Sequence, residues 1–236
     1  KGENLLDKYK LDFISEISLK PSMFIPDSSL FQLSGIDSFL LALTIKKNLP
    51  PILNIFSELK GIAFNSQLPF LQKSKNSILS TDIVISNFAQ PNVYIRNKLL
   101  ELKINFLDRP SGYIAIGKEI PIKYNFLRKA KGLNFYLGLD TFNFDQLKDF
   151  SKGQAIDENI KLNNFIFDIN NIEIANNQFH QMNGSLSLKG KEIKGTIQSD
   201  KLSGKFIRDK SGFLRVELQD TQLQDISFLM NQKESS

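Results

Sequence analysis

Apolar and polar residues alternate along most of this chain with a period of two. The clearest example is the segment 179–220, where four short alternating runs are separated by turns rich in glycine, serine, aspartate and lysine. In the second run, Ile193, Gly195 and Ile197 alternate with polar residues. Alternation bounded by turn residues is typical of antiparallel strands that bury one face. The segment therefore predicts an antiparallel β-meander.

The same alternation predicts strands through the rest of the chain, at 11–19, 31–45, 52–64, 78–86, 93–96, 99–107, 113–116 and 133–139. Within the second of these, Gly35 predicts a bulge or a point of close backbone approach. A short helix is expected near 144–150, where Phe144, Leu147 and Phe150 have helical spacing. The predicted fold class is mostly β, with antiparallel meander sheets and one or two short helices.

Ser151-Lys152-Gly153 is the candidate boundary between two β segments. This divides the chain into a β segment at 1–150, a C-terminal β-meander at 151–226 and a flexible tail at 227–236. One internal similarity predicts a repeated hairpin. Both 57–61 and 199–204 contain serine, an acid, leucine, one further residue and glycine, with one residue inserted in the second.

The composition excludes several kinds of chemistry. The chain has no cysteine, which removes disulfides, thiolate nucleophiles and sulfur-ligated metals, and its single histidine, His180, cannot form a histidine-rich metal site. No nucleophile elbow, zinc-protease motif or glycine-rich phosphate loop is present. We therefore expect no enzyme activity, no cofactor and no metal.

Two further features concern the membrane and the ends of the chain. No run of about 18 apolar residues occurs, so no transmembrane helix is expected in this chain. The first residues, Lys1-Gly2-Glu3, include neither an initiator methionine nor a signal peptide. We therefore interpret the sequence as a fragment of a longer protein.

The net charge is +5, and the densest basic stretch is 118–131, which contains a single acid, Glu119. Its candidate contacts for anionic headgroups are Lys123, Arg128, Lys129 and Lys131. A solvated hairpin is the other interpretation of the same stretch, and it is the one we favour. Nucleic-acid binding is not expected, because the phenylalanines occupy inward-alternating positions instead of lining a basic groove.

Two short motifs resemble a known family. Ser57-Glu58-Leu59-Lys60-Gly61 is followed by Leu68-Pro69-Phe70-Leu71-Gln72-Lys73, and the chain ends in a glycine-turned meander that contains 193–200, 202–206 and 213–218. This order of a serine–acid–leucine–x–glycine turn, a proline-containing loop ending in lysine and a closing meander resembles the YhdP branch of the AsmA-like proteins, relatives of TamB. The resemblance covers residues 30–226.

The resemblance implies a long β-sheet curled into a taco-like trough, apolar inside and polar outside. It also implies a periplasmic location in a Gram-negative bacterium, with an inner-membrane anchor in a region missing from this chain. The implied function is phospholipid transport to the outer membrane and maintenance of its barrier, with acyl chains and envelope proteins as partners. The groove candidates are Ile62, Phe64, Leu186, Leu188, Ile193, Ile197, Leu202, Phe206, Val216 and Leu218.

The alternative is a closed β-sandwich that serves as a structural or protein-interaction module without lipid. Alternation is the same for a face packed in a closed core and for a face that lines an open trough. The sequence therefore leaves both hypotheses open.

Overall fold

The computed structural model describes residues 10–20, 31–66, 68–147, 162–174, 176–190 and 192–219. The protein is mostly β, with 64% strand, which confirms the predicted fold class. The chain divides into two compact units, residues 1–117 and 118–236. The sequence-based boundary after residue 150 falls inside the second unit, because the strand before it pairs with the strand after it.

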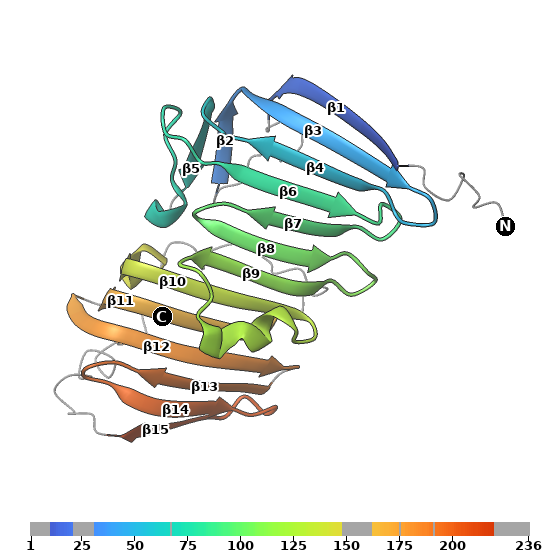
Figure 1. Cartoon of the computed structure of the whole chain (residues 1–236). Helices are drawn as coiled ribbons and strands as arrows, with labels where there is room; N and C mark the ends of the chain where they lie inside the picture. The colour runs from blue at the N-terminus through green and yellow to red at the C-terminus, as the bar shows by residue number, and fades with distance from the viewer. Residues whose placement is uncertain are drawn as a thin grey trace. The chain divides into compact units, whose positions relative to one another are not determined.

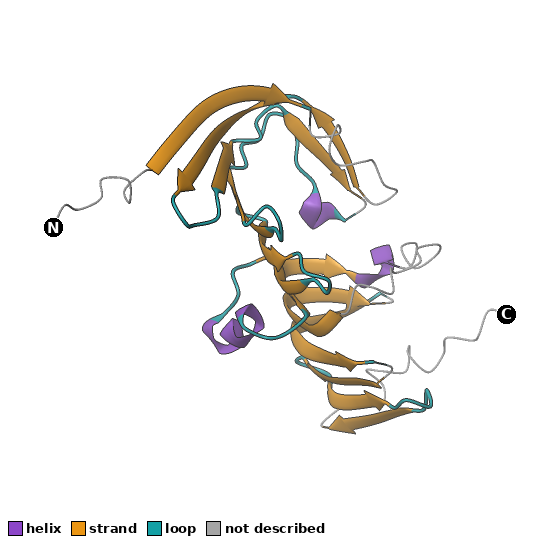
Figure 2. Ribbon diagram, turned by 90° about the vertical axis from the view of Figure 1, so that its right-hand side faces the viewer, coloured by secondary structure: helices purple, strands orange, loops and turns teal. Residues whose placement is uncertain are grey.

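The main sheet of the first unit is an antiparallel sheet whose strands neighbour one another in the order β1-β3-β4-β6-β7-β8-β9 (Figure 1). Their bounds are β1 Lys10–Leu19, β3 Asp37–Lys46, β4 Ile52–Ser57, β6 Thr81–Ser86, β7 Asn92–Arg96, β8 Leu100–Asn105 and β9 Ser111–Gly117. Each segment alternates apolar and polar residues, as antiparallel strands with one buried face do. The long strands of this unit arch strongly (Figure 2).

A second, two-stranded sheet formed by β2 (Phe31–Gly35) and β5 (Ile62–Ser66) belongs to the first unit. Strand β2 leads into β3, and β4 leads into β5, and both connections turn at a glycine. A Cβ on Gly35 would lie 2.1 Å from the carbonyl oxygen of Gly61, and a Cβ on Gly61 would lie 1.9 Å from that of Ile36. The expected close approach at Gly35 is therefore confirmed, and the bend requires glycine in both connections.

The closed core of the first unit lies where this small sheet meets one end of the main sheet. The buried residues of this core are Leu33, Phe39, Leu59, Ile62 and Leu79. Asp37 stabilises the turn at 57–61 beside this core, because its carboxylate accepts hydrogen bonds from Ser57 Oγ at 2.7 Å and from the Lys60 amide at 3.0 Å. The core thus covers only the end of the main sheet near β2 and β5.

The second unit contains a sheet with the strand order β10-β11-β12-β13-β14-β15. The bounds are β10 Leu133–Asn143, β11 Leu162–Ile174, β12 Asn177–Lys189, β13 Glu192–Gln198, β14 Ser203–Arg208 and β15 Leu214–Gln219. The meander from β12 to β15 is antiparallel, as predicted. The β10–β11 pair differs, because it is parallel and makes the sheet mixed. A parallel pair needs a crossover connection, which alternation within the strands does not reveal.

Three short 3₁₀ helices complete the described elements: η3 Pro69–Leu71, η4 Ile122–Arg128 and η5 Phe144–Leu147. The helix expected near 144–150 therefore begins where predicted, and residues 148–150 lie outside the described part of the chain. Helix η4 occupies the stretch that the sequence interpretation treated as a hairpin, so that interpretation is corrected. Pro121 is the N-cap residue directly before η4, where a residue without an amide hydrogen is tolerated.

Alternation breaks at the same level in three neighbouring strands of the second unit. Two consecutive exposed polar residues occur in β10, β11 and β12, at 140–141, 170–171 and 180–181, each pair flanked by buried apolar residues. Gln181 has a positive φ of 50°, so the backbone of β12 departs from regular strand geometry at this level. His180 is one of these exposed residues.

The two similar turns share a local structure. Ser57 Oγ accepts the Leu59 amide at 3.0 Å, and Ser199 Oγ accepts the Leu202 amide at 2.9 Å. Both leucines are buried. The acids differ, because the Asp200 carboxylate accepts the His180 amide, whereas the carboxylate that fixes the first turn belongs to Asp37. The repeated hairpin stays a prediction.

Candidate functional site

The register of the second unit brings most groove candidates onto one face of its sheet. Residues directly opposite each other in paired strands point to the same side, so the pairing defines rows across the sheet. One row is Leu137, Phe167, Gly184, Ile197, Gly204 and Leu218, and the next is Phe135, Phe165, Leu186, Gly195, Phe206 and Val216. Leu188 and Ile193 lie in a third row on the same face, which continues into Arg208 and Leu214. We call this the apolar face of the second unit.

Glycines in these rows are covered by large side chains from the neighbouring strand. A Cβ on Gly184 would lie 2.4 Å from the Phe167 ring, and a Cβ on Gly195 would lie 2.1 Å from the Phe206 ring. Gly204 is covered in the same way by Leu218. Rings that lie over glycines fill the missing side-chain volume and stabilise the pairing. They also keep the apolar face level, because the rings lie down on the sheet.

The opposite face of β12 to β15 is polar. Ser185 Oγ and Thr196 Oγ1 are 2.9 Å apart, Lys194 pairs with Glu192 at 2.9 Å, and the Arg215 guanidinium pairs with Glu217 at 2.9 Å. Hydrogen bonds to Lys194 and the positive charge of its ammonium hold the pKa of Glu192 below its ordinary value. The sheet is therefore amphipathic, with one face suited to water and the other to hydrocarbon.

Exposure of the apolar face is highest on β15. Ile169 on β11 and Met182 on β12 are buried, the candidates on β12, β13 and β14 are partly exposed, and Val216 on β15 is 54% exposed. The exposed apolar side chains on β15 therefore offer a contact surface to an apolar ligand.

Three groove candidates are not on this face. Leu202 lies in the turn between β13 and β14 and is buried. Ile62 is fully buried and Phe64 packs against the same closed core, both on strand β5 of the first unit. Ile62 and Leu202 therefore lie in packed interiors, and Phe64 is a partly buried residue at the edge of the closed core.

The first unit carries an apolar face of its own, which the sequence-based candidate list missed. One row is Phe13, Leu43, Leu53, Ile85, Val93 and Ile104, and the next contains Leu41, Ile55, Ile83, Ile95, Leu102 and Ile114. Phe13 is exposed and the other side chains are partly exposed. The alternation in 31–45 and 99–107 was the signal that could have identified this face.

Lys73 is buried beside the small sheet and binds the turn of the first motif. It is only 7% exposed, and its ammonium donates hydrogen bonds to the carbonyl oxygens of Leu59 at 2.5 Å, Ile62 at 2.7 Å and Ser74 at 3.0 Å. Burial lowers the pKa of Lys73, and the carboxylate of Asp37 opposes this shift. Lys73, which ends the proline-containing loop motif, therefore stabilises the serine–acid–leucine–x–glycine turn at 57–61.

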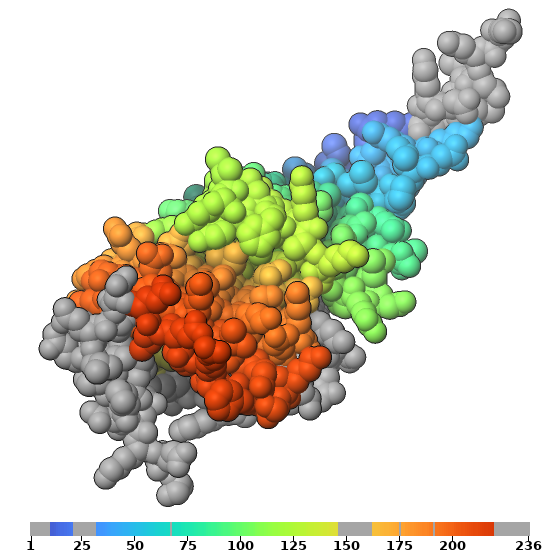
Figure 3. Space-filling view, turned by 90° about the horizontal axis from the view of Figure 1, so that it is seen from below, coloured from blue at the N-terminus to red at the C-terminus, as the bar shows by residue number. Residues whose placement is uncertain are grey.

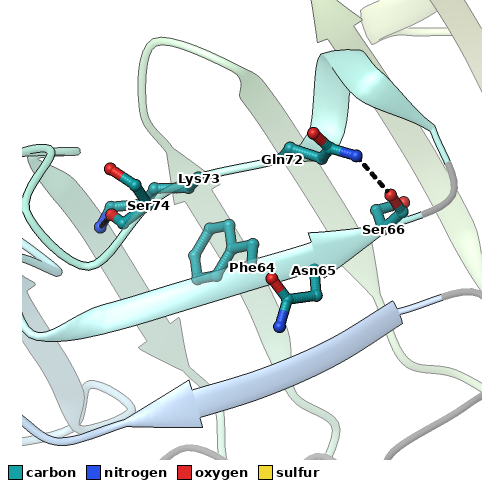
Figure 4. Close-up of a pocket in the computed structure, with 6 residues that line it drawn as sticks. All are labelled: Phe64, Asn65, Ser66, Gln72, Lys73 and Ser74. Carbon is teal, nitrogen blue, oxygen red and sulfur yellow. Dashed lines mark hydrogen bonds between the residues drawn. The ribbon is translucent and has the colours of Figure 1, made fainter.

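An open pocket of about 360 Å³ lies next to this lysine, lined by Phe64, Asn65, Ser66, Gln72, Lys73 and Ser74 (Figure 4). Two of its polar side chains already have partners within the chain. Gln72 Nε2 donates to the Ser66 carbonyl at 2.8 Å, and Lys73 Nζ binds the three carbonyls described above. Gln72 and Lys73 are therefore held by partners within the chain itself.

The four headgroup candidates lie on the opposite side of the sheet from the apolar face. Lys123 and Arg128 belong to η4, and Lys129 and Lys131 follow it. Tyr124 of η4 packs against Tyr136, with ring centroids 6.0 Å apart, and Lys123 Nζ lies 4.0 Å from Asp168. Tyr136 and Asp168 point away from the apolar face, because they alternate with its members along β10 and β11.

Burial, reinforced by the Asp168 carboxylate and by Tyr124, raises the pKa of Tyr136 to about 12, so its hydroxyl stays neutral. A neutral, buried ring under η4 supports the helix by packing. The basic candidates therefore do not line the same surface as the apolar candidates of this unit.

Comparison with known proteins gives no match to a family model, to a curated protein or to a solved structure. In the described residues, no helix is long and apolar enough to cross a membrane. The same residues contain no group of three or more histidine, cysteine or acidic side chains arranged to hold a metal ion.

Proposed function

We propose that the apolar face of each unit binds phospholipid acyl chains, and that the chain is a non-enzymatic lipid-conduit segment of a YhdP/AsmA-like periplasmic protein. The observation that carries this proposal is the unbroken apolar surface of the second unit. Its two rows contain only apolar residues and glycine across six neighbouring strands. Such a surface accepts hydrocarbon without leaving a polar group unsatisfied.

The dimensions of these rows suit a lipid tail. Strands lie about 4.8 Å apart, so a row across six strands is about 24 Å long. The hydrocarbon core of a bilayer is about 30 Å thick, and one acyl chain spans about half of it. Each methylene that leaves water contributes about 0.8 kcal/mol. A chain lying along one row is therefore accommodated over its whole length.

The proposed membrane setting and the proposed transport role rest on the sequence resemblance, and one contact supports that resemblance. Lys73 joins the two motifs on which the resemblance is based, since its ammonium binds the Leu59 carbonyl. In the proposed setting, a region outside this chain anchors the protein in the inner membrane. The segment then supports phospholipid movement between the inner and outer membranes and the barrier of the outer membrane, together with envelope proteins.

The test is native mass spectrometry of the protein purified from a Gram-negative host, before and after delipidation. Phospholipid should be bound at a defined stoichiometry. Phe206→Asp should remove it from the second unit and Ile85→Asp from the first, because a carboxylate within a row opposes hydrocarbon contact. Val216→Asp is a second variant for the second unit, at a side chain exposed enough to tolerate the change.

Phe206→Asp and Ile85→Asp each have a matched control on the adjacent residue of the same strand. Ile207→Asp and Val84→Asp place the same charge on the opposite faces of β14 and β6, and both should keep the lipid. Circular dichroism would confirm that all the variants are folded. A wild-type protein that carries no lipid, or controls that lose it equally, would reject the proposal in favour of a closed structural module.

A further inference from the structure

Helix η4 presents one side to the sheet and two sides to solvent. A 3₁₀ helix has three residues per turn, so residues three apart share a side. Tyr124 and Leu127 form the inner side, and Leu127 is almost fully buried. The outer sides therefore carry Ile122, Asn125 and Arg128 in one line, and Lys123, Phe126 and Lys129 in the other.

Each outer line combines an exposed apolar side chain with cations. Ile122 is 88% exposed and Phe126 is 51% exposed. Single exposed apolar residues are common on protein surfaces. Two of them on one seven-residue helix, each beside basic side chains, make a surface that is apolar and positively charged together. In the space-filling view, this yellow-green segment lies on the surface of the second unit (Figure 3).

Within the described residues, the lysines of this segment form few ion pairs. Lys118 pairs with Asp140 at 2.7 Å, whereas Lys123 reaches Asp168 only at 4.0 Å. Lys129 and Lys131 form no ion pair with any residue within the described ranges. These exposed ammonium groups are available to an external anion.

Side-chain amides hold the segment in place. Asn134 Nδ2 donates to the carbonyls of Ala130 at 3.1 Å and Gly132 at 3.2 Å, and Asn163 Nδ2 donates to that of Lys131 at 2.6 Å. Figure 2 shows η4 standing on one side of the strands of its unit. The exposed side chains therefore project from a fixed base, which lowers the entropy that is lost on binding.

We infer that η4 and the residues after it dock onto the surface of an anionic lipid bilayer. The ammonium and guanidinium groups bind headgroup phosphates, while Ile122 and Phe126 enter the boundary between headgroups and acyl chains. This surface lies opposite the apolar face, so the inference is independent of the proposed acyl-chain binding.

The absence of tryptophan from the chain allows a direct test. Ile122→Trp introduces one fluorophore at the proposed insertion point of the full chain. Its emission should shift to the blue when phosphatidylglycerol vesicles are added, and should remain unchanged with phosphatidylcholine vesicles. High salt should reverse the shift, because the Debye length falls to about 3 Å at about 1 M.

The matched control is Ile14→Trp, at an isoleucine of the first unit that is 73% exposed. Its emission should not change with either kind of vesicle. Lys129→Gln combined with Lys131→Gln should weaken vesicle binding by about 25-fold, at about fivefold per cation near an anionic membrane.

Three outcomes would overturn the inference: no shift of Ile122→Trp on phosphatidylglycerol vesicles, an equal shift of Ile14→Trp, or a shift with polyglutamate but not with vesicles. The last result would assign the surface to an acidic protein partner. None of these outcomes affects lipid retention by the apolar faces, so failure here is distinct from failure of the proposed function.

Discussion

Replacing Gly61 with alanine should lower the free energy of unfolding of the first unit by about 3 kcal/mol or more. The new Cβ would lie 1.9 Å from the carbonyl oxygen of Ile36. Because this obstacle is backbone, no side-chain rotation relieves it, and the bend that carries the small sheet must open. Amide hydrogen exchange of β4 and β5 measures the effect, and exchange of β12 to β15 should remain unchanged.

Gly190→Ala separates the effect of a steric collision of the new Cβ from the effect of backbone strain. Gly190 has a positive φ of 64°, but no atom lies within 4 Å of the position its Cβ would take. Alanine there should cost about 1 kcal/mol, from the left-handed backbone alone. Gly35→Ala combines both effects, because Gly35 has a positive φ of 111° and a colliding carbonyl. If Gly61→Ala were as mild as Gly190→Ala, the bend would not depend on the absence of a side chain.

Replacing Lys73 with methionine should destabilise the first unit by about 3 kcal/mol, because hydrogen bonds from a charged donor contribute about 1.5–3 kcal/mol each. Methionine keeps an unbranched apolar stem but leaves the carbonyls of Leu59 and Ile62 without the ammonium donor. Urea unfolding followed by circular dichroism gives the change in stability.

Lys75→Met is the matched control two residues later. Lys75 is exposed, so its replacement should change the stability by less than about 0.5 kcal/mol. Equal effects of the two substitutions would mean that the buried ammonium contributes nothing beyond its aliphatic stem. Lys73→Arg offers a second comparison, because its charge is kept but its larger planar head does not fit the space of an ammonium.

The positions of the strands follow from the sequence, but the partner of each strand does not follow everywhere. Alternation within 179–220 was sufficient for β12 to β15, since short turns force neighbouring strands to be antiparallel. It did not indicate the parallel pairing of β10 and β11. That pairing depends on how the chain crosses between Asn143 and Leu162, and a strand alternates in the same way whichever direction its neighbour runs.

The candidate site was predictable as a pattern but not as a surface. Ile197 and Ile62 both occupy apolar positions in alternating segments, yet Ile197 is partly exposed and Ile62 is fully buried. The difference arises from the small sheet of β2 and β5, which covers one end of the main sheet in the first unit. A second layer depends on long-range packing, which the period of a strand does not encode.

Composition identified the basic residues, but the side of the sheet on which they lie is determined by η4. Lys123 and Arg128 stand on the polar side because Tyr124 and Leu127 bury the inner side of that helix. A helix of this kind has a period of three, and Pro121 directly before it is the local signal that could have indicated its start.

The level surface formed where rings cover glycines has a consequence for selectivity. The two rows of the second unit contain no hydrogen-bonding side chain, and Phe167 and Phe206 fill the hollows at Gly184 and Gly195. A ligand lying there meets no shaped pocket and no polar group to recognise. It is distinguished only by how much hydrocarbon it lays down, at about 0.8 kcal/mol for each methylene. Within these two rows, the strength of binding therefore depends on the amount of hydrocarbon that is buried.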